Sequence, residues 1–135
     1  MQIISGNMWD ELGNCDLILF TANSTVKDGR LVMGGGAART ARDHFPKSDV
    51  VFGSILEKHD LVNKIFGLIF VDTPDTNKGF IPARPIQNTV LGAFQTKAEV
   101  WKDSTLGLVE YSTHLLHGIA HNYDRIVLNM PGTGL

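Results

Sequence analysis

The sequence has little of what would mark a secreted, membrane-bound or polyanion-binding protein. Cys15 is the single cysteine among 135 residues, which excludes an internal disulfide framework and a cysteine metal cluster. No apolar run approaches the ~18 residues that span a bilayer, and the N-terminus lacks a basic region followed by an apolar signal core. The 12 Lys and Arg residues are outnumbered by 14 Asp and Glu residues. We therefore expect a cytoplasmic protein that binds neither a membrane nor polymeric DNA or RNA.

What is present fits one globular domain. Hydrophobic residues make up 43% of the chain and charged residues 19%, which is ordinary globular composition. This length is enough for one domain with one core. Because no internal repeat, low-complexity segment or linker interrupts the chain, we predict a single domain over residues 1–135.

Apolar runs of strand length alternate with segments of helical spacing. Strands are predicted over residues 2–5, 16–20, 67–71, 88–95 and 125–129, with a brief extended piece at 80–81. Helices are predicted over 37–45, 48–59 and 105–119, and a helical turn over 8–12. This alternation predicts a mostly parallel sheet covered by helices on both faces. Ligands of such sheets bind beyond the carboxyl ends of the strands.

The stretch from Asp16 to Phe45 carries the strongest functional signal, with a strand, a polar loop, three consecutive glycines and a helix. Amide groups at a helix N-terminus are unpaired and carry the positive end of the dipole, and glycine lets a ligand approach the backbone. Such glycines also occur simply to permit a tight turn, so both interpretations stay open. Asn23, after the strand, is either an Asx-turn former or a carboxamide suited to the vicinal hydroxyls of a ribose.

Four short motifs follow one another along the chain: Ser5-Gly6-Asn7-Met8, Thr21-Ala22-Asn23-Ser24, residues 32–38 (VMGGGAA) and residues 131–135 (PGTGL). In this order they resemble the macrodomains, which bind ADP-ribose and in many members hydrolyse its derivatives. The segments DGRLVMGGGAARTARDHFP and GAFQTK are most similar to short phage and bacterial macrodomains of the ADP-ribose-1″-phosphate phosphatase type. The resemblance implies a three-layer α/β/α fold with a mixed, mostly parallel sheet, in a bacterial or host-cell cytoplasm, with no cofactor.

The resemblance also implies how the ligand lies. Two glycine loops would hold the diphosphate of ADP-ribose from both sides, with adenosine toward Asn7 and Met8 and the distal ribose toward Asn23. Most macrodomains have an adenine-reading aspartate where this chain has Asn7, which either accepts a hydrogen bond there or caps the turn after it. The implied ligand-binding residues are Gly6, Asn7, Met8, Ala22, Asn23, Gly34, Gly35, Gly36, Ala37, Pro131, Gly132, Thr133 and Gly134.

Asn23 and Lys97 are the implied catalytic residues. Lys97 matches the lysine of a deacylating branch of macrodomains, whose amine attacks the opened ribose aldehyde with help from an aspartate after the last glycine loop. The sequence stops at Leu135, so either the protein ends before that aspartate and the helix that usually follows it, or the sequence lacks its tail. A surface lysine is the competing interpretation. We expect hydrolysis of ADP-ribose 1″-phosphate or of an ADP-ribosyl ester. The alternative is a non-catalytic binder of ADP-ribose or a related nucleotide signal.

The remaining candidates are weaker. His114, His117 and His121 have spacings that would allow a metal pair on a helix, but no carboxylate motif accompanies them. A half-exposed helix face is the favoured interpretation, and no metal site is expected. Cys15 lies beside a strand, where a lone cysteine is more often a small core residue than a nucleophile.

Overall fold

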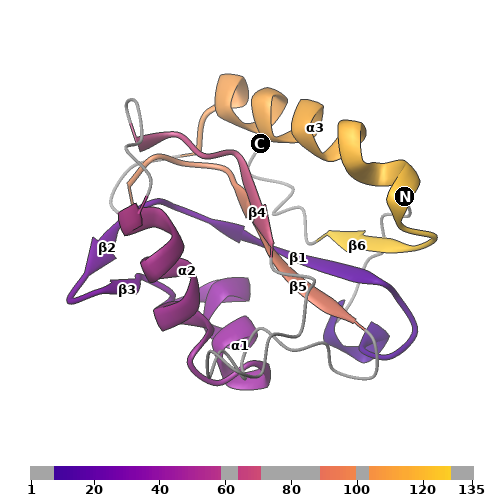
Figure 1. Cartoon of the computed structure of the whole chain (residues 1–135), viewed down its shortest axis with the longest axis horizontal. Helices are drawn as coiled ribbons and strands as arrows, with labels where there is room; N and C mark the ends of the chain where they lie inside the picture. Colours follow the sequence, from indigo (N-terminus) through magenta and orange to yellow (C-terminus); the bar gives the residue numbers. More distant parts are fainter. Residues whose placement is uncertain (1–7, 59–63, 71–88, 100–103, 129–135) are drawn as a thin grey trace.

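The structure, a computed structural model, describes residues 8–58, 64–70, 89–99 and 104–128, which include a four-stranded sheet (Figure 1). Its strands are β1 (Leu17–Ala22), β4 (Leu68–Phe70), β5 (Val90–Gln95) and β6 (Ile126–Leu128), in the order β4-β5-β1-β6. β1 pairs in parallel with both β5 and β6, whereas β4 runs antiparallel to β5. The predicted mixed, mostly parallel sheet is confirmed.

Side chains that alternate along the strands build a core on each face of the sheet. On β1, Ile18 and Phe20 join the core beneath α1 (Gly36–His44) and α2 (Ser48–Lys58), while Leu17 and Leu19 join the core beneath α3 (Leu106–Ile119). Each fully buried side chain of this kind stabilises the fold by about 1.5–3 kcal/mol. Figure 1 shows α1 and α2 on one side of the sheet and α3 on the other. The three-layer α/β/α arrangement is confirmed.

A short hairpin brings the chain from β1 to the glycine stretch. β2 (Val26–Lys27) pairs antiparallel with β3 (Arg30–Leu31), and the residues between them, Asp28 and Gly29, have φ values of 54° and 78°. Two left-handed residues give the turn type that matches the twist of paired strands. A Cβ on Gly53 of α2 would lie 2.3 Å from the Gly29 carbonyl oxygen. Glycine at position 53 therefore lets α2 lie directly on the hairpin.

The remaining short elements extend or anchor the helices. η1 (Met8–Glu11) is the helical turn predicted over 8–12, and η5 (Ala120–Asn122) follows α3. Trp9 stacks on His44 with ring centroids 5.0 Å apart and donates a hydrogen bond to Thr40 Oγ1 at 2.8 Å, which ties η1 to α1. The extended pieces predicted at 2–5 and 80–81 lie outside the described residues.

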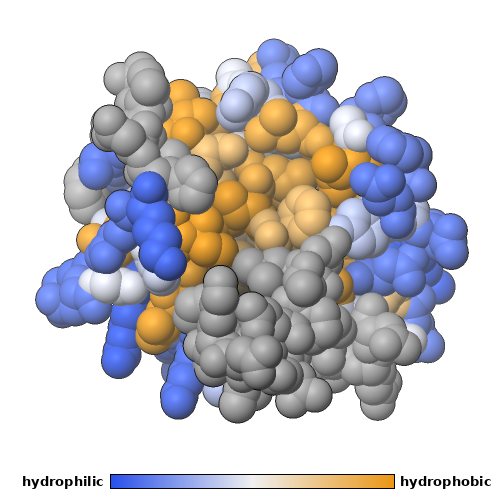
Figure 2. All heavy atoms as spheres, viewed as in Figure 1, coloured by the Kyte–Doolittle hydropathy of each residue, from blue (hydrophilic) through white to orange (hydrophobic). Residues whose placement is uncertain are grey.

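One face of the molecule is apolar between α2 and α3. Figure 2 shows hydrophobic side chains gathered there, over β4, whose residues are only half-buried. Ile65 and Tyr111 are among the large apolar side chains that remain exposed in the described part of the chain. No helix within the described ranges is long and apolar enough to cross a membrane.

Candidate functional site

A cavity of about 460 Å³ opens at the carboxyl ends of β1 and β5. It lies between the loop after β1, the glycine stretch that enters α1, and the residues that follow β5. This is the position at which parallel sheets bind their ligands. The cavity is lined by Thr21, Ala22, Asn23, Val32, Gly34, Gly35, Gly36, Ala37, Ala38, Thr96, Lys97 and Ser104.

The glycine stretch presents the N-terminus of α1 to the cavity. Gly35 is the N-cap residue, with φ −150° and ψ 162°, and no side chain caps the helix. Among the described residues, a Cβ added to Gly34, Gly35 or Gly36 would meet no atom within 4 Å, and Gly36 has a left-handed φ of +58°. The first turn of α1 carries no acidic residue. Within the described residues, no side chain therefore crowds the glycines at the N-terminus of α1, where the helix dipole is positive.

Asn23 is held by its own loop. Its side chain is 5% exposed, Nδ2 donates to the Val32 carbonyl oxygen at 3.1 Å, and Oδ1 accepts from the Thr25 amide at 2.8 Å. The second of these bonds makes the Asx turn that the sequence allowed. A carboxamide has a further N–H and a further lone pair, so the turn does not exhaust its hydrogen-bonding capacity. The turn fixes Asn23 at the cavity wall.

Lys97 follows β5 on a backbone that is bonded to its neighbours on both sides. The Thr96 amide donates to the Ala22 carbonyl oxygen at 3.0 Å, and the Ala98 carbonyl oxygen accepts from both the amide and the hydroxyl of Ser24, at 2.9 and 2.6 Å. Lys97 is partly buried and lines the cavity.

The structure brings together most of the predicted site residues that it describes. Those that line the cavity are Ala22, Asn23, Gly34, Gly35, Gly36, Ala37 and Lys97. Met8 does not line it, because its side chain is buried in the core beneath α1 and α2. Six other predicted ligand-binding residues lie outside the described residues: Gly6, Asn7, Pro131, Gly132, Thr133 and Gly134.

Several lining residues were missed from the sequence. Thr21 and Thr96 are neighbours in sequence of predicted residues, so their small hydroxyl side chains at two strand ends could have been included. Ser104 lies just before α3 and reaches the cavity only because that helix packs across the sheet. No local pattern predicts such a contact.

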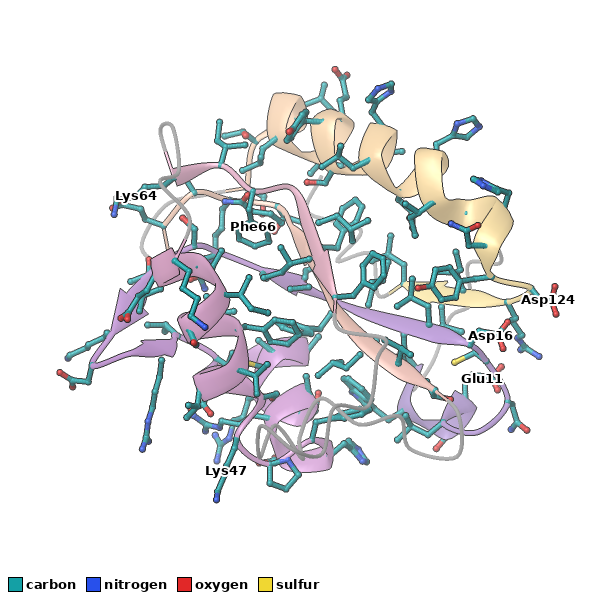
Figure 3. The ribbon with its side chains drawn as sticks, in the orientation of Figure 1. Glu11, Asp16, Lys47, Lys64, Phe66 and Asp124 are labelled. Carbon is teal, nitrogen blue, oxygen red and sulfur yellow. The ribbon has the colours of Figure 1, made fainter. Side chains whose placement is uncertain are left out.

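The opposite end of the sheet is closed by its own side chains. Asp16 Oδ2 accepts from the amides of Asp124 and Arg125 at 2.8 and 3.0 Å, and the Arg125 guanidinium pairs with Glu11 (Figure 3). Burial raises the pKa of the Cys15 thiol there. A neutral buried thiol is a poor nucleophile, which agrees with the interpretation of Cys15 as a core residue.

The three histidines near the end of the chain lie apart from the cavity. His114 and His117 on α3 and His121 on η5 are all exposed. Among the residues that the structure describes, no group of three or more His, Cys, Asp or Glu side chains could hold a metal ion.

Comparison with known proteins gives a match in structure only. No protein-family model and no curated protein matches the sequence. The macrodomain of Thermus aquaticus DarG superposes with a TM-score of 0.70 at 20% identity, over 99% of this chain and 80% of that chain. The chain has the macrodomain fold. The resemblance drawn from the four sequence motifs is thus confirmed at the level of the fold.

Two further macrodomain structures are similar. The macrodomain of Mycobacterium tuberculosis DarG matches with a TM-score of 0.66 at 17% identity, over 94% of this chain and 74% of that chain. Thermosipho africanus DarTG in complex with ADP-ribose matches with a TM-score of 0.68 at 20% identity. That match covers 93% of this chain but 31% of the DarTG chain. At such identities the likeness concerns the fold.

Proposed function

We propose that the cavity binds ADP-ribose and that the protein hydrolyses an ADP-ribose derivative, either ADP-ribose 1″-phosphate or an ADP-ribosyl ester. The observation that carries this proposal is the meeting of three features in one cavity: the uncapped glycine N-terminus of α1, the fixed carboxamide of Asn23 and the amine of Lys97. The cavity volume of about 460 Å³ lies within the range of small-molecule sites.

The N-terminus of α1 suits a phosphate group. The chain has a formal net charge of −2, so a phosphate must be held by local groups rather than by the overall charge. Backbone amides at a helix N-terminus donate hydrogen bonds to phosphate oxygens, and the helix dipole favours the negative charge. The bare glycines let the diphosphate approach these amides without meeting a side chain. The second glycine loop, at 132–134, would hold the diphosphate from the other side.

Asn23 and Lys97 suit the chemistry at the distal ribose. The carboxamide of Asn23 would bind ribose hydroxyls through its remaining donor and acceptor. Lys97 as an ammonium would stabilise the charge that develops on a departing phosphate or carboxylate. As a neutral amine it would instead attack the aldehyde of the opened ribose. Lys97→Arg distinguishes the two roles. A guanidinium can stabilise developing negative charge, but it stays protonated and cannot attack the aldehyde.

The binding half of the proposal is tested with Gly35→Glu. No atom of the described ranges lies within 4 Å of the new Cβ, so we expect the fold to be kept while the carboxylate occupies the proposed phosphate position. Gly107→Glu is the matched control, because Gly107 lies in the first turn of α3 and is equally open. Calorimetry with ADP-ribose, AMP and NAD should show binding of ADP-ribose lost in Gly35→Glu and kept in Gly107→Glu. Unchanged affinity in a folded Gly35→Glu protein would contradict the proposal.

A non-catalytic binder is the second candidate, and the Asx turn of Asn23 favours it because a carboxamide already bonded on both atoms suits rigid recognition. Asn23→Ala separates the two. If Asn23 acts in the transition state, release of phosphate from ADP-ribose 1″-phosphate should fall by much more than ADP-ribose affinity. Equal losses would assign Asn23 to ground-state recognition. A wild-type protein that binds ADP-ribose but turns over neither the 1″-phosphate nor an ester would be a binder.

A further inference from the structure

The last residue of β5, Gln95, is a polar side chain with 0% exposure, and the proposed function gives it no role. Its Oε1 accepts from the amides of Phe66 and Gly67 at 2.7 and 2.9 Å. Its Nε2 donates to the carbonyl oxygens of Lys64 and Lys97 at 2.9 and 3.1 Å. A carboxamide has two donor hydrogens and two good acceptor positions, so this side chain is fully used. Figure 3 labels Lys64 and Phe66 in the segment that leads into β4.

Residues 64–67, which hydrogen-bond with the Gln95 side chain, form a turn that packs closely against α3. Lys64 and Gly67 have left-handed φ values of 60° and 79°. A Cβ on Gly67 would lie 2.6 Å from Leu115 Cδ1 and 2.9 Å from Tyr111 Cε2, both on α3. A non-glycine residue such as Lys64 keeps a left-handed backbone only where its surroundings impose it. The turn at 64–67 is therefore fixed by its packing on α3, and its position does not depend on Gln95 alone.

The backbone of Gln95 is fixed as firmly as its side chain. Its amide donates to the Gly67 carbonyl oxygen at 2.7 Å, and its carbonyl oxygen accepts from the buried Ser112 hydroxyl of α3 at 2.7 Å. The same carboxamide that is anchored on the turn also donates to the Lys97 carbonyl oxygen. That bond holds the peptide after Lys97 and so restricts the direction in which the Lys97 side chain leaves the backbone.

We infer that Gln95 is a positioning residue, which fixes Lys97 at the wall of the cavity through the Lys97 carbonyl. The inference rests on the proposed function insofar as Lys97 acts on a bound ligand. A carboxamide that served only the turn at 64–67 would need no bond to the residues that follow β5. The bond to Lys97, two residues further along the chain, joins the turn to the cavity wall. Loss of Gln95 should therefore misplace the amine while leaving the glycine N-terminus of α1 intact.

Gln95→Met tests this inference, because methionine fills a similar volume and makes none of these hydrogen bonds. Thr89→Val is the matched control at the opposite end of the same β-ladder. The buried Thr89 hydroxyl accepts from the Gly13 amide at 2.8 Å and donates to the Cys15 carbonyl oxygen at 2.6 Å. Both variants thus lose hydrogen bonds of a buried side chain at or next to an end of β5, but only Gln95→Met alters a contact to Lys97.

The readout is capture of ADP-ribose at Lys97. The aldehyde of the opened distal ribose condenses with the amine and releases water, and cyanoborohydride then transfers a hydride to the imine to give a stable secondary amine. Peptide mass mapping measures the adduct at saturating ADP-ribose, and calorimetry measures the affinity. We expect Gln95→Met to lower the adduct yield by about tenfold or more while affinity changes by less than about threefold. Thr89→Val should change neither quantity.

The outcomes separate this inference from the proposed function. An unchanged adduct yield in folded Gln95→Met, or an equal loss in Thr89→Val, would overturn the inference. So would a wild-type protein that binds ADP-ribose without any adduct, although ADP-ribose binding would then stand. If wild type fails to bind ADP-ribose, the proposed function fails, and reductive methylation of Lys97 by formaldehyde decides instead. Its rate should rise by about threefold in Gln95→Met, as the side chain is released, and an unchanged rate overturns the inference.

If Gln95→Met does not fold, Gln95→Glu is used as the second variant. A carboxylate keeps the acceptor for the Phe66 and Gly67 amides but has no hydrogen to donate to the Lys64 and Lys97 carbonyl oxygens. The two bonds from the Phe66 and Gly67 amides are thus kept, whereas the contacts to the Lys64 and Lys97 carbonyl oxygens both become repulsive. The same loss of adduct is expected, and a wild-type yield would overturn the inference.

Discussion

Two helices of this protein begin in opposite ways. α3 begins after Thr105, whose side-chain oxygen accepts a hydrogen bond from the Leu108 amide at 3.3 Å. α1 begins after Gly35, which has no side chain to accept such a bond. Both N-cap residues have an extended backbone, so a serine, threonine or aspartate would be accommodated at either position. The difference therefore lies in the side chain and not in the backbone.

The presence of a side-chain cap on α3 and its lack on α1 suit the two helix N-termini to different roles. The amides of a helix N-terminus must find partners, and a side-chain cap contributes about 1 kcal/mol to the helix. α3 obtains this stabilisation from its own sequence. α1 has no such cap where Gly34, Gly35 and Gly36 line the cavity, and we propose that its first amides bind a ligand instead. Functional sites commonly give up local stability in this way.

Adding a cap to α1 should have the largest effect. In Gly35→Asp the new carboxylate would accept from the first amides of α1, as Thr105 does in α3. We expect ADP-ribose affinity to fall by about 100-fold or more, or about 2.7 kcal/mol, while the helix gains roughly 0.5–1 kcal/mol of stability. Calorimetry and urea unfolding measure the two quantities. A stabilised Gly35→Asp protein that still binds ADP-ribose normally would show that the open N-terminus has no binding role.

Adding a methyl group to a glycine in the first turn should act in opposite directions in the two helices. Gly36 has φ +58°, so Gly36→Ala should destabilise the protein by about 1–2 kcal/mol, although the new Cβ would meet no atom of the part of the chain that the structure describes. Gly107 of α3 is equally open but has no left-handed φ, so Gly107→Ala should stabilise it by roughly 0.5–1 kcal/mol. Urea unfolding curves compare the pair. A Gly36→Ala protein as stable as wild type would mean that its backbone relaxes out of the left-handed region.

Removing the cap of α3 should have the smallest effect. Thr105→Ala loses the bond from the Leu108 amide and should cost about 1 kcal/mol in unfolding free energy. Thr105 does not line the cavity, so ADP-ribose affinity should stay within about twofold of wild type when both are measured well below their melting temperatures. A large loss of affinity in Thr105→Ala would remove the distinction between the two helix starts.

The sequence predicts those features that local spacing controls. Apolar runs of strand length predict β1 and β5, and the spacing of apolar residues predicts α2 and α3. The glycine stretch was correctly placed at a helix N-terminus because glycines before a helical pattern leave few other arrangements. The parallel sheet then brought Asn23, Lys97 and the glycines to one cavity, since parallel strands end on the same side.

Features that depend on distant contacts could not be predicted. Gln95 reads locally as a polar residue at the end of a strand, yet it is buried because the segment at 64–67 folds around it from about 30 positions away in sequence. Ser104 reaches the cavity only through the packing of α3. The sequence gives an Asx turn as one of two interpretations of Asn23, but the second bond of this side chain, to the Val32 carbonyl oxygen, depends on how the hairpin returns.

The central claim is that the N-terminus of α1 binds the diphosphate of ADP-ribose. The most direct test is an NMR titration of the uniformly ¹⁵N-labelled protein with ADP-ribose. The amides of Gly35, Gly36, Ala37 and Ala38 should shift on binding, because they would donate to or lie against the diphosphate, while the amides of Leu106, Gly107 and Leu108 at the capped start of α3 should stay in place. Saturable binding of ADP-ribose with the α1 amides unmoved would contradict the account, as would the absence of any binding.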